Sequence, residues 1–214
     1  MRGSSKLREM VQETRLSARD FVYPLFVTYG RNVQLEIAPM PGMYQLSLDR
    51  LLPEIATVVD LGIPAVLLFG IPRTKDAEGS EAYDANGIIQ EAVRVIKQSA
   101  PELLVITDVC LCDYTDHGHC GVINNGAVDN DRSLDLLART ALCQAEAGAD
   151  MVNDVSGLRD PAMLELVRDR GCAVCIMHML GEPGDMQSDP QYTDVVAEVS
   201  RELNASAQSL IDQG

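Results

Sequence analysis

Three cysteines lie close together in the segment DVCLCDYTDHGHCG. Cys110 and Cys112 flank one residue at the end of a predicted strand, so their side chains point the same way, and Cys120 follows across a loop. Three thiolates can hold one tetrahedral Zn²⁺ ion and leave its fourth position to water or substrate. Asp108 and His119 are near enough in sequence to orient the ligands or to carry protons. The alternative that the spacing leaves open is three reduced cysteines crowded into one loop.

The other cysteines, Cys143, Cys172 and Cys175, lie within apolar helix or strand patterns. They are predicted to be buried small hydrophobic side chains. The polar N-terminus lacks the apolar run of a signal peptide, and six cysteines without an export signal predict a reducing, cytoplasmic location.

The elements that must position the cysteines alternate between apolar runs and amphipathic stretches. Strands are predicted at residues 22–27, 65–70, 103–109, 151–157 and 173–179. Helices are predicted at residues 46–62, 88–100, 131–147, 160–171 and 193–213. The fold class is therefore α/β, with five consecutive βα units and a parallel sheet. Five units can form an incomplete (βα)8 barrel of the TIM type or an open parallel sheet.

The chain divides into an N-terminal arm, residues 1–20, and a single α/β domain, residues 21–214. An open sheet of five strands has two unpaired edges, which favour association with a second copy. We therefore expect self-association, with the arm as one means of contact.

The charge balance excludes two classes of partner. Lys and Arg number 17 and Asp and Glu 32, giving a net charge of −15. Binding to nucleic acid requires basic side chains against phosphates, and an anionic membrane surface would repel this chain. No run of about 18 apolar residues exists that could span a membrane. Whether the chain binds a small molecule is left open by its composition.

Residues 7–150 resemble porphobilinogen synthase, also called 5-aminolevulinate dehydratase. The matching stretches are MVQETRLSARDFVYPLFV, MPGMYQLSLD, LGIPAVLLFGIP, KDAEGSEA and PELLVITDVCLCDYTDHGHCG. The resemblance implies a barrel enzyme of haem biosynthesis that condenses two aminolevulinate molecules. It also implies zinc on Cys110, Cys112 and Cys120, one ion per chain. Residues 21–150 would then form βα units one to three.

The same family forms Schiff bases between lysines of its second half and the substrate. This chain has three lysines, Lys6, Lys75 and Lys97, and all three are predicted to be solvated surface charges. Without a desolvated lysine the covalent route is closed. On this reasoning no residue is assigned as catalytic, and the dehydratase reaction is not expected.

Residues 148–214 resemble a different barrel family, dihydropteroate synthase of folate biosynthesis, through the run AGADMVNDVSGLRDPAMLELVRDRGCAVCIMHMLGEPGDMQ. Residues 151–214 would form units four and five. The resemblance implies pterin contacts from Asn153 and Met177. Their alternatives are an amide that caps a loop and a methionine of the core. His178 is expected to serve a hydrogen bond rather than a metal.

Two specific resemblances joined within one βα unit predict a chimeric or designed partial barrel. Such a chain would have a three-cysteine zinc site and no parental activity, because function depends on assembled sites. The first alternative is a zinc-dependent dehydratase of the porphobilinogen synthase type. The second alternative is a pterin-binding module.

Overall fold

The structure is a computed structural model that describes residues 4–157, 163, 168–169, 171–181, 186 and 189–212. Its helices and strands follow one another as α1 (Ser5–Met10), β1 (Val22–Thr28), β2 (Gln34–Glu36), β3 (Tyr44–Leu46), α2 (Leu48–Asp60), β4 (Ala65–Ile71), α3 (Ile88–Ser99), β5 (Leu104–Val109), β6 (Val122–Asn124), β7 (Ala127–Asp129), α4 (Asn130–Ala147), β8 (Met151–Asp154), β9 (Ala173–Ile176) and α6 (Val195–Asp212). The predicted helix at residues 160–171 lies mostly outside the described residues.

Seven strands form one sheet in the order β2-β3-β1-β4-β5-β8-β9. The five predicted strands pair in parallel along the chain, as β1 with β4, β4 with β5, β5 with β8 and β8 with β9. The α/β fold class is therefore confirmed. Within the described part of the chain β9 pairs only with β8, so the sheet does not close into a barrel.

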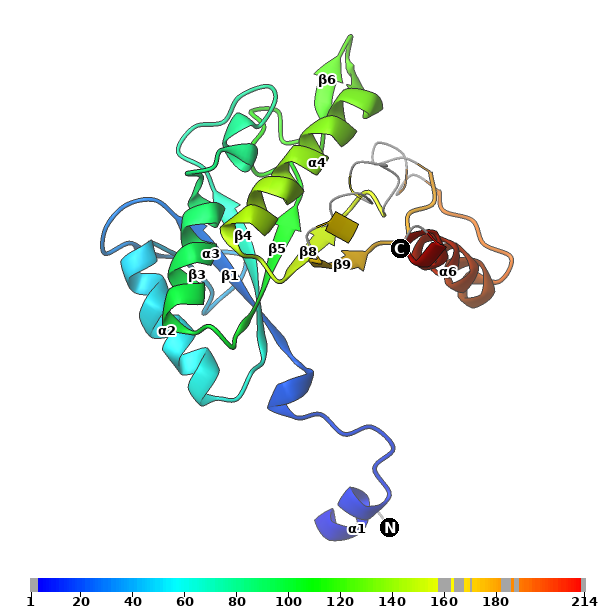
Figure 1. The fold of residues 1–214 in the computed structure, drawn as a ribbon. Helices are drawn as coiled ribbons and strands as arrows, with labels where there is room; N and C mark the ends of the chain where they lie inside the picture. Colours follow the sequence, from blue (N-terminus) through cyan, green and yellow to red (C-terminus); the bar gives the residue numbers. More distant parts are fainter. Residues whose placement is uncertain are drawn as a thin grey trace.

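Alternate residues of β1, β5 and β8 are buried against a layer formed by α2, α3 and α4 (Figure 1). In β1 these are Leu25 and Val27, and in β5 they are Val105, Thr107 and Val109. This alternation follows from the period of two along a strand. The other face of β5 carries Asp108, which the alternation therefore keeps away from the apolar layer.

The sequence pattern missed the short strands. β2 and β3 pair antiparallel at one edge of the sheet, and β6 and β7 form a separate hairpin. Each of these strands has three residues, which is too short for an alternating pattern to be recognised.

The N-terminal segment extends away from the sheet (Figure 1). Its short helix α1 contains no buried residue. Leu7, Met10, Val11 and Leu16 are 46%, 77%, 60% and 70% exposed. The arm therefore presents apolar side chains that its own chain leaves uncovered. No helix within the described ranges is both long enough and apolar enough to cross a membrane.

Candidate metal centre

The three predicted ligands converge directly after β5. The Cys110 Sγ atom lies 3.3 Å from the Sγ atoms of both Cys112 and Cys120. All three sulfur atoms lie within 4.8 Å of one another. A tetrahedral zinc ion with Zn–S bonds of about 2.3 Å would require sulfur separations of about 3.8 Å. Small side-chain movements would therefore let the sulfurs hold such an ion.

The loop that carries the cysteines is folded by local hydrogen bonds. The backbone N–H groups of Tyr114 and Thr115 both donate to Leu111 O at 2.9 Å, which closes a turn that contains Cys112. The Thr115 hydroxyl donates to His119 O at 2.9 Å and so holds the residue before Cys120 close to that turn.

Tyr114 anchors this loop in the core, where it is only 5% exposed. Its hydroxyl lies over Gly70 of β4, and a Cβ atom at Gly70 would collide with the Tyr114 oxygen. The glycine therefore provides the space that the tyrosine ring occupies.

The three thiols affect one another's ionisation. The single S–H of Cys110 is within hydrogen-bond distance of the sulfur atoms of both Cys112 and Cys120, and these contacts raise the pKa of Cys110. The contact with Cys110 lowers the pKa of Cys120 to about 3. A thiolate at Cys120 is the form that a metal ion binds. The donor set consists of sulfur alone, which suits zinc and other soft ions.

Asp108 and Asn153 were predicted separately and lie side by side. They are register partners on β5 and β8. The Asn153 amide Nδ2 donates to Asp108 Oδ1 at 2.8 Å. Burial raises the pKa of Asp108 to about 6. The pair forms a carboxyl and amide group at the carboxyl ends of adjacent strands, where parallel barrels hold ligands.

His119 lies near the cysteines in sequence but is exposed. Its backbone N–H donates to His117 Nδ1 at 3.2 Å, and the two imidazole rings are 5.6 Å apart. Among the described residues the group of metal-donor atoms contains the three cysteines alone. A role for His119 in orienting the ligands stays a prediction.

Met177 is 38% exposed and lines a cavity of about 140 Å³ together with Cys120, Val155 and Met179. A side chain predicted for pterin contact thus shares a cavity with a metal-site thiol. His178 lies beside it, with Nε2 2.8 Å from the Tyr192 hydroxyl and Nδ1 2.9 Å from a carboxylate oxygen of Glu202. These contacts agree with the expectation that His178 serves a hydrogen bond.

The burial predicted for the cysteines outside the cluster is confirmed for Cys172 and wrong for Cys143 and Cys175, and the solvated charge predicted for Lys97 is wrong. Of the cysteines outside the cluster, Cys172 is buried, Cys143 is half-buried and Cys175 is exposed. Cys175 is exposed because it alternates along β9 with Val174 and Ile176, which pack against the core from the other face. Lys97 is not a solvated charge, since its amine donates to both carboxylate oxygens of Asp150, at 3.1 and 3.0 Å. The pattern placed Lys97 on the helix surface but could not show that Asp150 comes next to it.

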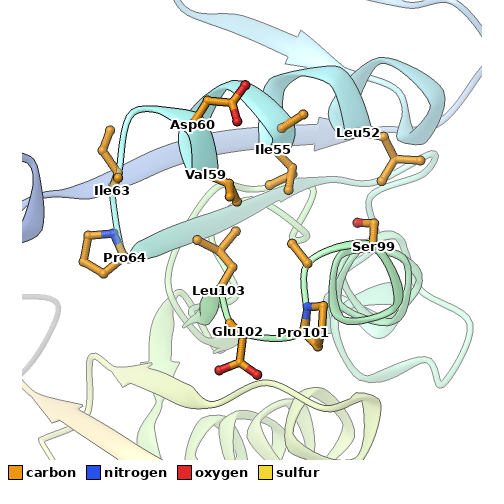
Figure 2. A pocket seen from close by; sticks show the side chains of 13 residues that line it. Leu52, Ile55, Val59, Asp60, Ile63, Pro64, Ser99, Pro101, Glu102 and Leu103 are labelled. Carbon is orange, nitrogen blue, oxygen red and sulfur yellow. The ribbon is translucent and has the colours of Figure 1, made fainter.

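A second cavity, of about 610 Å³, lies at the opposite end of the sheet. Figure 2 shows Ile55 and Val59 of α2 facing Leu103 across it, with Asp60 and Glu102 at its outer edges. We refer to this cavity as the α2–α3 groove. It is apolar and contains no group predicted to do chemistry.

The family relationship follows from comparison with known proteins. Residues 1–169 match the family model described as Delta-aminolevulinic acid dehydratase. The chain belongs to this dehydratase family. Residues 133–214 also match the model described as Pterin binding enzyme, so the resemblance in two parts is confirmed.

Individual relatives agree with the family match. The Delta-aminolevulinic acid dehydratase of Halalkalibacterium halodurans is 55% identical over 152 residues, which is 71% of this chain and 46% of that protein. The crystal structure of the dehydratase from Toxoplasma gondii has a TM-score of 0.79 at 28% identity, covering 97% of this chain and 66% of that chain. Dihydropteroate synthase of Yersinia pestis has a TM-score of 0.56 at 19% identity, covering 95% of this chain and 62% of that chain, and shares the fold.

The prediction of a chimera without parental activity is wrong. Curated relatives between 45% and 55% identical are named Delta-aminolevulinic acid dehydratase. The three lysines of this chain are not the whole set of a complete barrel, since the chain spans about half the length of the curated relatives it matches. The residues of half a barrel cannot by themselves decide whether the reaction of the whole barrel occurs.

Proposed function

We propose that this chain supplies the metal centre of a dehydratase that condenses two 5-aminolevulinate molecules to porphobilinogen. The observation that carries the proposal is the convergence of the Cys110, Cys112 and Cys120 sulfur atoms within 4.8 Å. The membership of the family supports it, and the Toxoplasma gondii relative was crystallised with the product porphobilinogen.

Zinc held by the three cysteines would act as a Lewis acid toward a substrate oxygen. Asp108 lies two residues before Cys110, and its half-buried carboxyl group would be the group that accepts or releases a proton beside the metal. The amide of Asn153 fixes the orientation of this carboxyl group. Together these residues would bind and orient an oxygen-bearing substrate and transfer a proton beside it.

The test combines elemental analysis with an assay for porphobilinogen, on the chain purified without chelator. We expect about one zinc ion per chain and formation of product from 5-aminolevulinate. Both should be lost in the Cys110→Ser/Cys112→Ser/Cys120→Ser variant. The matched control is Cys175→Ser, which removes an exposed thiol outside the cluster. Zinc that binds without any turnover would reject the dehydratase activity and keep the metal site.

We also propose that copies of the chain associate through the N-terminal arm. The arm joins β1 at the end of the sheet where the α2–α3 groove lies. Residues 1–20 carry five basic and three acidic side chains, whereas the whole chain has a net charge of −15. An apolar, basic arm is therefore complementary to the groove of a second copy, with Asp60 and Glu102 at its edges.

Sedimentation of wild type and of a Leu7→Ser/Met10→Ser variant tests the arm. We expect wild type to sediment as an oligomer and the variant to shift toward the monomer. A wild-type monomer at micromolar concentration would reject the proposal.

We further infer a cytoplasmic location, because all six cysteines are free thiols.

A second candidate function is pterin binding, which the pairing of Asp108 with Asn153 favours. A pterin ring presents adjacent N–H donors that a carboxylate can accept, and a carbonyl oxygen that an amide can satisfy. Met177 would contact the ring from the next strand. Calorimetric titration of a pterin into wild type and Asn153→Ala tests this function. Equal heats from both chains, or no heat from wild type, would reject it.

A further inference from the structure

The loop between β4 and α3 is joined to the cysteine loop through Asp76. The backbone N–H of Asp76 donates to Tyr114 O at 3.3 Å, and the N–H of Asp116 donates to Asp76 O at 3.0 Å. These two bonds form a parallel bridge between Asp76 and Thr115. The position of residues 114–116 therefore depends on how the backbone of Asp76 is oriented.

The side chain of Asp76 sets that orientation. Its Oδ1 atom accepts hydrogen bonds from the backbone N–H groups of Glu78 at 2.9 Å and Ser80 at 3.1 Å. Its Oδ2 atom accepts a short hydrogen bond from the Ser80 hydroxyl. Aspartate side chains that bond to N–H groups two or more residues ahead fold a tight turn. The carboxylate therefore folds the 76–80 turn around itself.

A second contact crosses the same boundary between the loops. Glu78, within the turn, pairs with Arg132 at the start of α4 at 2.6 Å. The 76–80 turn is thus attached at two places, to residues 114–116 within the cysteine loop and to Arg132 at the start of α4.

The attached segment lies between two of the metal ligands. Tyr114 and Thr115 close the turn that contains Cys112 by donating to Leu111 O. The Thr115 hydroxyl holds His119 O, next to Cys120. A shift of residues 114–116 would therefore move Cys112 and Cys120 relative to Cys110.

We propose that Asp76 is a positioning residue of the three-cysteine metal centre. Its carboxylate folds the 76–80 turn, and the backbone of that turn holds residues 114–116 where Cys112 and Cys120 reach Cys110. Asp76 contacts no sulfur atom and acts through the backbone. This role rests on the proposed function, because it requires that the cysteines bind a metal ion.

Titration of the full chain with Co²⁺ tests the role, because thiolate ligands give cobalt an intense charge-transfer absorption. We expect Asp76→Ala to weaken cobalt binding by about 10- to 100-fold, the range found when groups that support metal ligands are removed. Asp76→Asn keeps an oxygen acceptor for the two N–H groups and should recover most of the affinity. Ser80→Ala removes one bond to the carboxylate and should cause a smaller loss.

The matched control is Asp84→Ala. Asp84 lies in the same loop and accepts a hydrogen bond from the N–H of Asn86 at 2.8 Å, without an attachment to residues 114–116. The Asp84→Ala variant should have the cobalt affinity and absorption spectrum of wild type. Circular dichroism reports whether each variant folds, and Ser80→Ala decides the case if Asp76→Ala does not fold.

The positioning role would be overturned if Asp76→Ala bound cobalt with the affinity and spectrum of wild type. If only Ser80→Ala folds, the same result in that variant would overturn it. An equal loss in Asp84→Ala would also overturn it, since the effect would then be general to the loop. A wild-type chain that binds no cobalt would overturn the metal centre, and the positioning role with it.

Discussion

Replacing Lys97 by methionine should destabilise the chain substantially, because this lysine joins three segments. Its amine donates to Pro101 O at 2.8 Å, to Leu103 O at 3.2 Å and to both carboxylate oxygens of Asp150. Asp150 in turn accepts the Val105 N–H at 2.8 Å. The lysine thereby ties the end of α3 to the starts of β5 and β8.

The expected magnitude follows from the exposure of the pair. The side chains of Lys97 and Asp150 are 25% and 31% exposed, so solvent screens them only in part. Hydrogen bonds to charged groups contribute about 1.5–3 kcal/mol each, and exposed ion pairs about 0–1 kcal/mol. We expect Lys97→Met, which removes all of these hydrogen bonds together, to lower the free energy of unfolding by about 2–3 kcal/mol.

Urea unfolding followed by circular dichroism, at one fixed protein concentration, measures this loss. Lys6→Met is the matched control, since Lys6 pairs with Glu9 at 3.0 Å with side chains that are 84% and 60% exposed. That control should change the free energy of unfolding by less than about 0.5 kcal/mol. Equal free energies of unfolding for Lys97→Met and Lys6→Met would refute this expectation. Lys97 would then contribute no more to stability than an exposed lysine does.

Three further predictions concern the metal loop. Gly70→Ala should lower the free energy of unfolding by about 1–3 kcal/mol and weaken metal binding, because the added Cβ displaces Tyr114. Urea unfolding measures the first effect and Co²⁺ titration measures the second. Hydrogen bonds from Ser80 lower the pKa of Asp76 below 3.8, so its ionised form stabilises the fold above that pH and the contribution is lost as pH falls. Wild type should therefore be more stable than Asp76→Asn at pH 7, and the difference in urea midpoint should vanish in acid. Excess zinc should raise the unfolding temperature of wild type and leave that of the triple cysteine-to-serine variant unchanged, as measured by calorimetry.

The sequence predicts the sheet well where strands are long and apolar. The predicted strand at residues 65–70 corresponds to β4, Ala65–Ile71, and the helix predicted at residues 131–147 corresponds to α4, Asn130–Ala147. Gly148, predicted as the stop of that helix, has a φ of 106° and caps it. Apolar periodicity and glycine caps are local signals, which is why one sequence suffices to read them.

The candidate site is predictable only in part. The spacing of the three cysteines predicts their cluster because all lie within one loop. The pairing of Asp108 with Asn153 depends on the register of β5 and β8, which are separated by α4. The attachment of Asp76 to residues 114–116 joins two loops that follow different strands. Such contacts between distant segments leave no periodic signal in a single sequence.

The lengths of the strand pairs suggest an order in which backbone amides would exchange with deuterated solvent. β1 and β4 share seven register pairs, whereas β8 and β9 share four, and no residue of α6 is buried. Amides of β9 should therefore exchange, through local opening, before those of β1 and β4. The cysteine loop follows β5, which is separated from β9 by β8 and is paired on both sides, with β4 and with β8. Partial opening at the β9 edge would thus leave the sulfur cluster intact.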